Sequence, residues 1–222
     1  MLGNIFIFGD SYSTYEGMIP EGYAVYYSKE GRGDPEFMVT KMELSDTWWM
    51  RLINATGATL VQNNSWSGST VCYTGYSGDC SHTSSFIFRY RQLKEKGFFD
   101  ENKIDTLFVF GGTNDSWSNA PLGELKYDDF KEDELFGVLP GISYFMKTLK
   151  EDLPGTRIIF IANCDIKPEV VEGIKNAGEH FGVETVALEG ITKEHGHPNV
   201  KGMGEICEQV LAHLNKQKNV TL

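Results

Sequence analysis

Short apolar runs alternate along the chain with longer segments in which apolar residues recur every three or four positions. Each run has four to six residues, and the runs are rich in Ile, Val and Phe. Runs of this kind are typical of strands that are covered on both faces, as in a parallel sheet. They lie at residues 5–8, 59–62, 106–110, 157–162 and 184–188.

The segments between the runs have the spacing of amphipathic helices. Behind Pro168, a residue suited to the first turn of a helix, one apolar residue recurs at each turn. The members of this series are Val170, Ile174, Ala177 and Phe181. A similar series near the end of the chain consists of Met203, Ile206, Val210, Leu211 and Leu214. Both series predict helices.

Two further helices have signals at their ends. Asp46 precedes an apolar segment and is interpreted as an N-cap, and Gly57 is expected to end that helix. Another helical pattern covers residues 135–149, where Pro140 should kink the helix or delay its start. Because strands and helices alternate, we expect right-handed crossovers and a parallel sheet between two helical layers. The sequence therefore predicts a single three-layer αβα domain of the α/β class over residues 1–222.

Residues 12–45 form the first of two insertions into this alternation, and they are too long to be a turn. Within them Tyr23, Val25 and Tyr27 alternate with other residues, as in a strand. Residues 31–35 then break the pattern with Gly and Pro. This combination predicts a small hairpin.

The second insertion, residues 67–85, is rich in Ser, Gly, Tyr and Thr. Long loops in compact domains are usually binding elements or lids, so we expect this segment to border the functional site. Cys72 and Cys80 lie within it. A disulfide between them and two free thiols are the two alternatives.

The charge of the chain limits its partners. It has 20 Lys and Arg against 31 Asp and Glu, which gives a formal net charge of −11. Nucleic acids and anionic membranes attract positively charged surfaces, so neither is expected as a partner. No apolar stretch approaches the roughly 20 residues of a membrane-spanning helix, so membrane insertion is not expected either. The chain starts without a visible export leader, which predicts a cytoplasmic location, although a leader already removed would leave the same sequence.

Polar clusters follow the first three predicted strands, and a fourth cluster precedes the last helix. They are residues 9–11, 63–70, 111–115 and 195–199. In an open parallel sheet the loops at the carboxyl ends of the strands meet at one edge, where ligands bind. Among these clusters Ser11 supplies a hydroxyl and His197 an imidazole, the pair that a serine nucleophile and its general base require.

Acyl transfer also needs donors for the negative charge that develops on the oxygen of the tetrahedral intermediate. The Ser11 N–H, the Gly68 N–H and the Asn114 side-chain amide are available for this. One such donor lowers the barrier by roughly 3–4 kcal/mol. A glycine at position 68 also lets the backbone come close to a ligand. The sequence thus contains candidates for nucleophile, base and oxyanion hole.

The order of these blocks resembles that of the SGNH (GDSL-type) hydrolases. The blocks are Gly9-Asp10-Ser11, Gly68, Gly111-Gly112-Thr113-Asn114-Asp115 and His197-Pro198. The resemblance spans residues 5–214 and implies a flavodoxin-like five-stranded sheet, a serine esterase mechanism and no metal or organic cofactor. It implies that Ser11 is the nucleophile and His197 the general base and acid. Ser11, Gly68 and Asn114 would be the oxyanion donors.

One position departs from the family pattern. The family usually has an Asp three residues before the histidine, and Glu194 stands there instead. Glu194 could orient the imidazole, while Asp165 or a backbone carbonyl in a Ser–His dyad are the alternatives. His195 and His197 could instead bind a metal together with Glu194, but two neighbouring histidines supply too few ligands for this to be the expected chemistry.

Five aromatic residues lie in loops beside the expected site: Tyr12, Trp66, Tyr73, Tyr76 and Trp117. They could bind substrate by stacking on a sugar ring or gripping an acyl chain, or they could pack the long loops onto the body of the protein. The expected substrate is a small-molecule ester with a small acyl group, such as an acetylated carbohydrate. An acyltransferase or thioesterase with the same site, and a catalytically idle binding module on the same fold, are the alternatives. The oligomeric state is left open by the sequence.

Overall fold

The computed structural model describes residues 2–31 and 40–220, and its centre is a five-stranded sheet in which all neighbouring strands run parallel. Each predicted run overlaps one of these strands. In spatial order they are β4 (Thr59–Ser65), β1 (Asn4–Gly9), β7 (Thr106–Gly111), β8 (Arg157–Ala162) and β9 (Glu184–Ala187). When the five strands are numbered by their order along the chain, their spatial order is 2-1-3-4-5, which is that of flavodoxin-like sheets. The predicted α/β fold is therefore confirmed.

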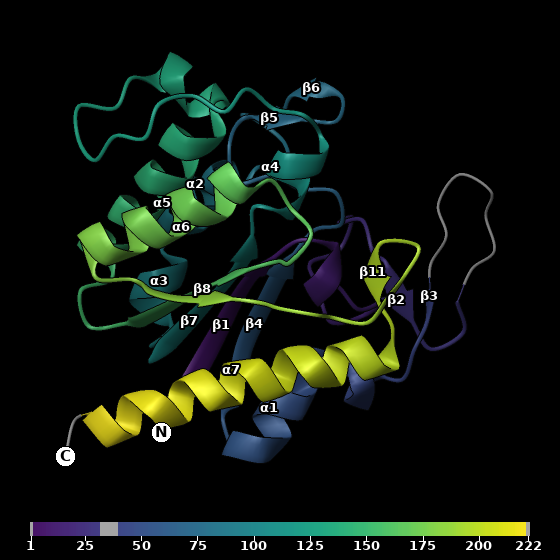
Figure 1. Cartoon of the computed structure of the whole chain (residues 1–222). Helices are drawn as coiled ribbons and strands as arrows, with labels where there is room; N and C mark the ends of the chain where they lie inside the picture. The colour runs from purple at the N-terminus through teal and green to yellow at the C-terminus, as the bar shows by residue number, and fades with distance from the viewer. Residues whose placement is uncertain (1, 32–39, 221–222) are drawn as a thin grey trace.

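Helices cover both faces of the sheet (Figure 1). One face is covered by α2 (Phe86–Glu95), α3 (Phe98–Glu101), α5 (Val138–Asp152) and α6 (Pro168–Phe181), and the other by α1 (Trp48–Thr56) and α7 (Val200–Val220). The strands serve both cores, because successive side chains of a strand point to opposite faces. In β1, Phe6 and Phe8 join the first core, and Ile5 and Ile7 join the second.

The cap of α1 differs from the prediction. Thr47, not Asp46, is the N-cap: its hydroxyl accepts a hydrogen bond from the Met50 N–H at 3.3 Å. Asp46 ends a preceding 3-10 turn, and its carboxylate pairs instead with Arg51 at 2.9 Å. Gly57 ends the helix as predicted, with a φ of 69° that glycine adopts without strain.

The two proline signals are confirmed. Pro168 is the first residue of α6, where its missing N–H costs nothing. Pro140 delays the start of α5 until Val138, so that the proline lies in the first turn. The residues before it form a separate 3-10 segment, η3 (Glu132–Phe136).

The hairpin predicted within residues 12–45 is wrong. The two short strands in this segment, β2 (Tyr27–Ser28) and β3 (Thr40–Lys41), pair in parallel, whereas the strands of a hairpin are antiparallel. A parallel pair needs a connection long enough to bring the chain back to the same end, which a tight turn cannot provide. Part of the connection, residues 32–39, lies outside the described residues.

The second insertion does contain a hairpin, formed by β5 (Thr74–Gly75) and β6 (Gly78–Asp79). Beyond its strands the Cys80 N–H donates to the Tyr73 carbonyl at 2.8 Å, so Cys80 lies opposite Tyr73 and not opposite Cys72. Cys72 and Cys80 are free thiols. Of the two alternatives that the sequence left open, a disulfide and two free thiols, the structure therefore has the free thiols.

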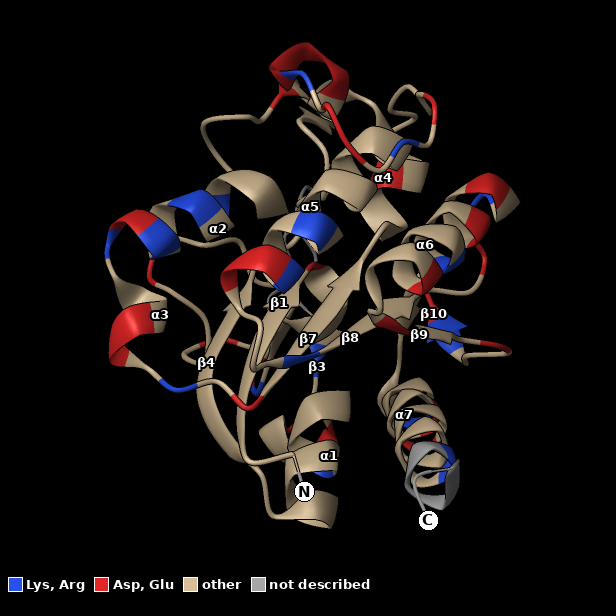
Figure 2. Ribbon diagram, turned by 90° about the vertical axis from the view of Figure 1, so that its left-hand side faces the viewer, with Lys and Arg blue, Asp and Glu red and all other residues tan. Residues whose placement is uncertain are grey.

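The acidic excess is distributed over the surface. Figure 2 shows Asp and Glu on α3 and α6, and Lys and Arg on the neighbouring helices α2 and α5. Several acidic residues are paired, as in the contacts of Glu134 with Lys126 at 2.8 Å and of Glu184 with Arg157 at 2.6 Å. In the part of the chain that the structure describes, no helix combines the length and the apolar character needed to cross a bilayer.

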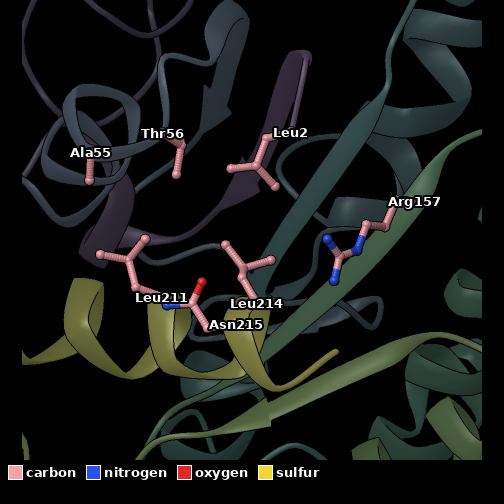
Figure 3. A pocket seen from close by; sticks show the side chains of 7 residues that line it. All are labelled: Leu2, Ala55, Thr56, Arg157, Leu211, Leu214 and Asn215. Carbon is pink, nitrogen blue, oxygen red and sulfur yellow. The ribbon is translucent and has the colours of Figure 1, made fainter. Parts of the chain in front are cut away.

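A cavity of about 400 Å³ lies between α1, α7 and the start of the sheet (Figure 3). Leu2 and Arg157, which line it, stand at the amino ends of β1 and β8. The charge of Arg157 is already matched by Glu184. This cavity is therefore at the edge of the sheet opposite to the loops that carry the predicted catalytic residues.

Candidate active site

Ser11 lies where β1 ends, at the first position of the 3-10 turn η1 (Ser11–Ser13). Helix α1 fixes this turn through two indole N–H groups. Trp48 Nε1 donates to Ser13 Oγ and Trp49 Nε1 donates to the Ser13 carbonyl, both at 3.1 Å. The two indoles of α1 thus fix the turn through Ser13, while the Ser11 hydroxyl faces the loops at the carboxyl edge of the sheet.

His197 lies on a small hairpin formed by β10 (Lys193–Glu194) and β11 (His197–Pro198). The turn between the strands consists of His195 and Gly196, with φ of 49° and 79°. Two-residue hairpin turns favour such left-handed angles because they match the twist of the flanking strands. The turn therefore determines where the His197 backbone stands.

The imidazole of His197 contacts Ser11 on one side and its own turn on the other. Its Nε2 is 2.9 Å from Ser11 Oγ, and its Nδ1 is 3.2 Å from the His195 carbonyl oxygen. Because a carbonyl can only accept, Nδ1 carries the proton and Nε2 is free to accept one from Ser11. The structure thus brings together the two residues that the sequence proposes as nucleophile and base.

Glu194, the predicted orienting acid, does not contact the imidazole. Its Oε1 accepts a hydrogen bond from Asn199 Nδ2 at 3.0 Å, at the start of α7. Asp165 is also engaged elsewhere, in an ion pair with Lys193 at 3.0 Å. The predicted contact of Glu194 with the ring is therefore absent among the described residues, and the group at Nδ1 is the His195 carbonyl, the arrangement of the dyad alternative.

Replacing Glu194 with Ala is expected to change kcat for p-nitrophenyl acetate by less than about threefold, because the carboxylate makes no bond to the imidazole. Asp165→Ala and the double variant should behave in the same way. Initial rates of all three against the wild type test this. A loss of several orders of magnitude in the Glu194 variant would show that a carboxylate orients His197 during turnover.

The turn at Gly68 leaves the Gly68 N–H free to donate a hydrogen bond to a ligand. The Ser69 N–H donates to the Trp66 carbonyl at 3.1 Å, which closes a turn with Gly68 at its third position. Gly68 has a φ of 80°, the left-handed angle that this turn requires and that favours glycine. Within the described residues the Gly68 N–H makes no hydrogen bond. Ser11, as the first residue of its turn, also has an N–H without an acceptor inside the turn.

Asn114 lies on the short helix α4 (Thr113–Trp117), directly after β7. Its Nδ2 donates to the Ser69 carbonyl at 2.9 Å, and its Oδ1 accepts from the Tyr76 hydroxyl at 3.0 Å. These two contacts define which end of the amide is nitrogen. The second hydrogen of Nδ2 is left for a ligand, since an amide nitrogen carries two.

The neighbouring residue, Asp115, serves structure. Its carboxylate accepts from the backbone N–H groups of Val71 and Cys72 at 3.0 Å. It is fully buried, and burial raises its pKa although these N–H groups oppose the rise. Asp115 thereby fastens the second insertion to α4.

Arg89, on α2, is a supporting residue that the sequence analysis did not identify. Its guanidinium is buried and donates to the Asn64 and Gly9 carbonyls and to Ser69 Oγ, the last at 3.1 Å. It thus connects the ends of β4 and β1 with the Ser69 segment that Asn114 contacts. A sequence signal existed: Arg89 shares a helical face with the apolar residues Phe86 and Tyr90.

Burial controls the charge states around the site. It lowers the pKa of His197 to about 4, and the positive charge of Lys193 acts in the same direction. It also raises the pKa of Asp10 to about 7, although the carboxylate accepts from the Tyr12 N–H at 3.0 Å as the cap of η1. At neutral pH the imidazole is therefore uncharged, which is the state that a general base needs.

Two of the five predicted substrate-binding aromatics, Tyr12 and Tyr73, are buried, which favours the alternative that they pack the loops. The Tyr12 hydroxyl donates to the Gly196 carbonyl at 2.6 Å and anchors the hairpin of His197. The Tyr73 hydroxyl donates to Glu132 at 2.8 Å, in a separate polar network. Both rings pack loops onto the body of the protein.

The other three aromatics remain accessible to different extents. Tyr76 is 57% exposed and Trp117 is 36% exposed, the first bonded to Asn114 and the second edge-on to the His197 ring at 6.1 Å between centroids. Trp66 is partly buried and packs against Tyr23 in a tilted arrangement, with 4.1 Å between ring centroids and 30° between planes. Tyr76 and Trp117 therefore form the aromatic rim of the site. Among the described residues, no three His, Cys, Asp or Glu side chains gather as a metal site would require.

Comparisons with known proteins identify the family and the fold of the chain. The model of the GDSL-like lipase/acylhydrolase family matches residues 3–214. No curated protein matches the chain. Two solved structures, described as GDSL-like lipases of Bacteroides, are similar over nearly their whole length. The Bacteroides ovatus protein is 33% identical, with a TM-score of 0.86 and coverage of 97% of this chain and 99% of the other.

The Bacteroides uniformis protein is 37% identical, with a TM-score of 0.84 and coverage of 96% of each chain. A more distant structure is an acetyl xylan esterase from the rumen bacterium Butyrivibrio proteoclasticus. It is 22% identical, with a TM-score of 0.62, and the match covers 98% of this chain and 64% of the other. At this identity the last similarity indicates a shared fold.

Proposed function

Because the chain belongs to the GDSL-like lipase/acylhydrolase family and is a carboxylic ester hydrolase, we propose that it hydrolyses a small acyl ester through an acyl-Ser11 intermediate. The observation that carries this proposal is the 2.9 Å contact between Ser11 Oγ and His197 Nε2. The tautomer that the His195 carbonyl selects leaves Nε2 as an acceptor, so the serine proton has a place to go.

In the first half of the proposed reaction, Ser11 Oγ attacks the ester carbonyl carbon and its proton moves to His197 Nε2. The tetrahedral intermediate collapses, the bond to the leaving alcohol breaks, and His197 returns the proton to the alkoxide. In the second half, water attacks the acyl-serine, again losing its proton to Nε2. The carboxylic acid leaves and Ser11 recovers its proton.

The negative charge of both intermediates falls on the former carbonyl oxygen. The Ser11 N–H, the Gly68 N–H and the second Asn114 Nδ2 hydrogen support an oxyanion hole, since none of the three has a hydrogen-bond acceptor in the described structure. These donors are preorganised by the Trp66–Ser69 turn, Arg89 and Tyr76. Donors fixed in advance stabilise the transition state without a cost for reorienting them.

For the substrate we propose an acetyl ester on a carbohydrate. Ser11 is only 3% exposed and three aromatic rings lie around His197, so we expect a short acyl group to be accepted more readily than a long one. The rim residues Tyr76 and Trp117 offer faces on which a sugar can stack. The fold of an acetyl xylan esterase lends support to the same substrate class.

Rates on p-nitrophenyl acetate, butyrate and octanoate, followed by acetate release from acetylated xylo-oligosaccharides, test the proposed substrate. We expect the acetate ester to react fastest and the octanoate at least about tenfold more slowly, because a misfit between an acyl chain and the side chains around it costs about this much. Product analysis with added methanol separates water from an alcohol as acceptor. A preference for octanoate, or no acetate release from the oligosaccharides, would contradict the proposal.

A further inference from the structure

His197 lacks the group that usually stabilises its charge. When Nε2 takes the serine proton, the ring becomes an imidazolium, and a carboxylate at Nδ1 normally stabilises it. Here Nδ1 meets a neutral carbonyl, and no carboxylate among the described residues contacts the ring. The nearby Lys193 has the wrong sign, and its charge lowers the pKa of the imidazole further. The charge of the transition state therefore needs another partner.

An aromatic face lies directly against the imidazole. The Tyr26 ring stacks on the His197 ring with 3.6 Å between centroids and 11° between planes. The ring of Tyr12 is farther away, at 5.3 Å and tilted, and Trp117 is edge-on. Only the Tyr26 face is placed so that its negative π-electrons cover a cation on His197.

The segment that carries Tyr26 is bonded close to both members of the dyad. The Tyr26 N–H donates to Thr14 Oγ1 at 2.9 Å, and that hydroxyl donates to the Ser11 carbonyl at 3.0 Å. On the other side, the hydroxyl of Tyr27 donates to the Pro198 carbonyl at 2.8 Å, next to His197. The stacked ring is therefore positioned by the same turn and the same hairpin that carry the nucleophile and the base.

We propose that Tyr26 is a positioning residue that orients His197 and stabilises its imidazolium through a cation–π contact, in the role that a carboxylate has in a triad. This inference rests on the proposed function of the Ser11–His197 pair. A desolvated cation–π contact is expected to be worth between about fivefold and thirtyfold in kcat. It should leave KM unchanged, because the imidazolium exists only after the substrate is bound.

The test keeps the shape of the ring and changes only its electrons. Position 26 is substituted with Phe and then with monofluoro-, difluoro- and pentafluorophenylalanine, which progressively weaken and finally reverse the charge of the ring face. Tyr127 supplies the matched control, since it stacks on His180 with 3.9 Å between centroids and 8° between planes, far along the chain from the dyad. The same series at position 127 should leave kcat and KM unchanged.

We expect Tyr26→Phe to retain kcat within about threefold and the pentafluoro ring to lower it at least about tenfold, in proportion to fluorination. The acid limb of kcat/KM, near pH 4 in the wild type, should move to lower pH along the series because a less stabilised imidazolium releases its proton more readily. Equal kcat values and equal acid limbs across the series would overturn the proposal.

Failure of the proposed function gives a different pattern. If Ser11→Ala were as active as the wild type, the serine mechanism would fail, and the pKa of His197 would then be measured directly by NMR titration of each variant at position 26. A fall in that pKa with fluorination supports the cation–π contact without reference to turnover. A pKa that stays constant refutes it.

Discussion

Replacing Ser11 with Ala is expected to lower kcat for p-nitrophenyl acetate by at least about 10⁴-fold, because the substitution removes the atom that forms the acyl-enzyme. The hydroxyl faces His197 Nε2 and belongs to no cap or core contact that the described structure shows. The fold should therefore survive, with the melting temperature within a few degrees of the wild type. Initial rates and thermal unfolding measure the two quantities.

Ser13 supplies the control within the same turn. Its Oγ accepts from Trp48 Nε1 and takes no part in the proposed chemistry. Ser13→Ala should lower stability by about 1–2 kcal/mol, since a buried donor loses its partner, while kcat falls far less than in the Ser11 variant. Equal activity of Ser11→Ala and the wild type would favour the idle binding module or a different nucleophile.

Replacing His197 with Ala should lower kcat by about 10³- to 10⁴-fold, because a serine hydroxyl is a weak nucleophile without a base. The cavity left beneath Tyr26 should admit free imidazole, which we expect to restore part of the rate in a saturable manner. The double variant with Ser11→Ala should be no slower than the slower single variant, since the two residues act as a unit.

Additive losses in the double variant would contradict this coupling. So would a His197→Ala enzyme with near-normal turnover, which would place the base elsewhere. Asn199→Ala is a useful comparison, because Asn199 caps α7 three residues from the end of the hairpin turn through its contact with the Gly202 N–H at 3.0 Å. It tests whether disturbing the neighbouring backbone alone lowers the rate.

The sheet and the positions of the proposed catalytic residues could be predicted because their signals are local. Buried parallel strands must be apolar on both faces, so runs such as residues 106–110 stand out from their surroundings. Ser11 and Asn114 each follow such a run, and the topology of a parallel sheet brings its carboxyl ends together. The pairing of Ser11 with His197 follows from this topology and not from their distance in sequence.

What could not be predicted depends on single contacts. Thr47 and Asp46 are both good caps, and the choice between them was made by the ion pair of Asp46 with Arg51. An alternating pattern predicts a strand but not the direction in which it pairs, and β2 and β3 pair in parallel. Glu194 occupies the expected position in sequence, but its side chain bonds to Asn199 instead.

The aromatic residues show the same limit. Sequence position placed Tyr12 and Tyr73 in loops near the site, but it carried no information on whether their rings point into the core. Tyr26 was missed because it lies in the first insertion, which has no family motif. Its stacking on His197 depends on the fold, which brings together two segments more than 170 residues apart in sequence.

The central claim is that His197 activates Ser11 as the nucleophile, and labelling with a fluorophosphonate followed by peptide mass spectrometry tests it most directly. We expect one adduct, on Ser11, formed rapidly in the wild type and in Glu194→Ala and at least about 10²-fold more slowly in His197→Ala. An adduct on another residue, or labelling of Ser11 at the same rate without His197, would contradict the claim.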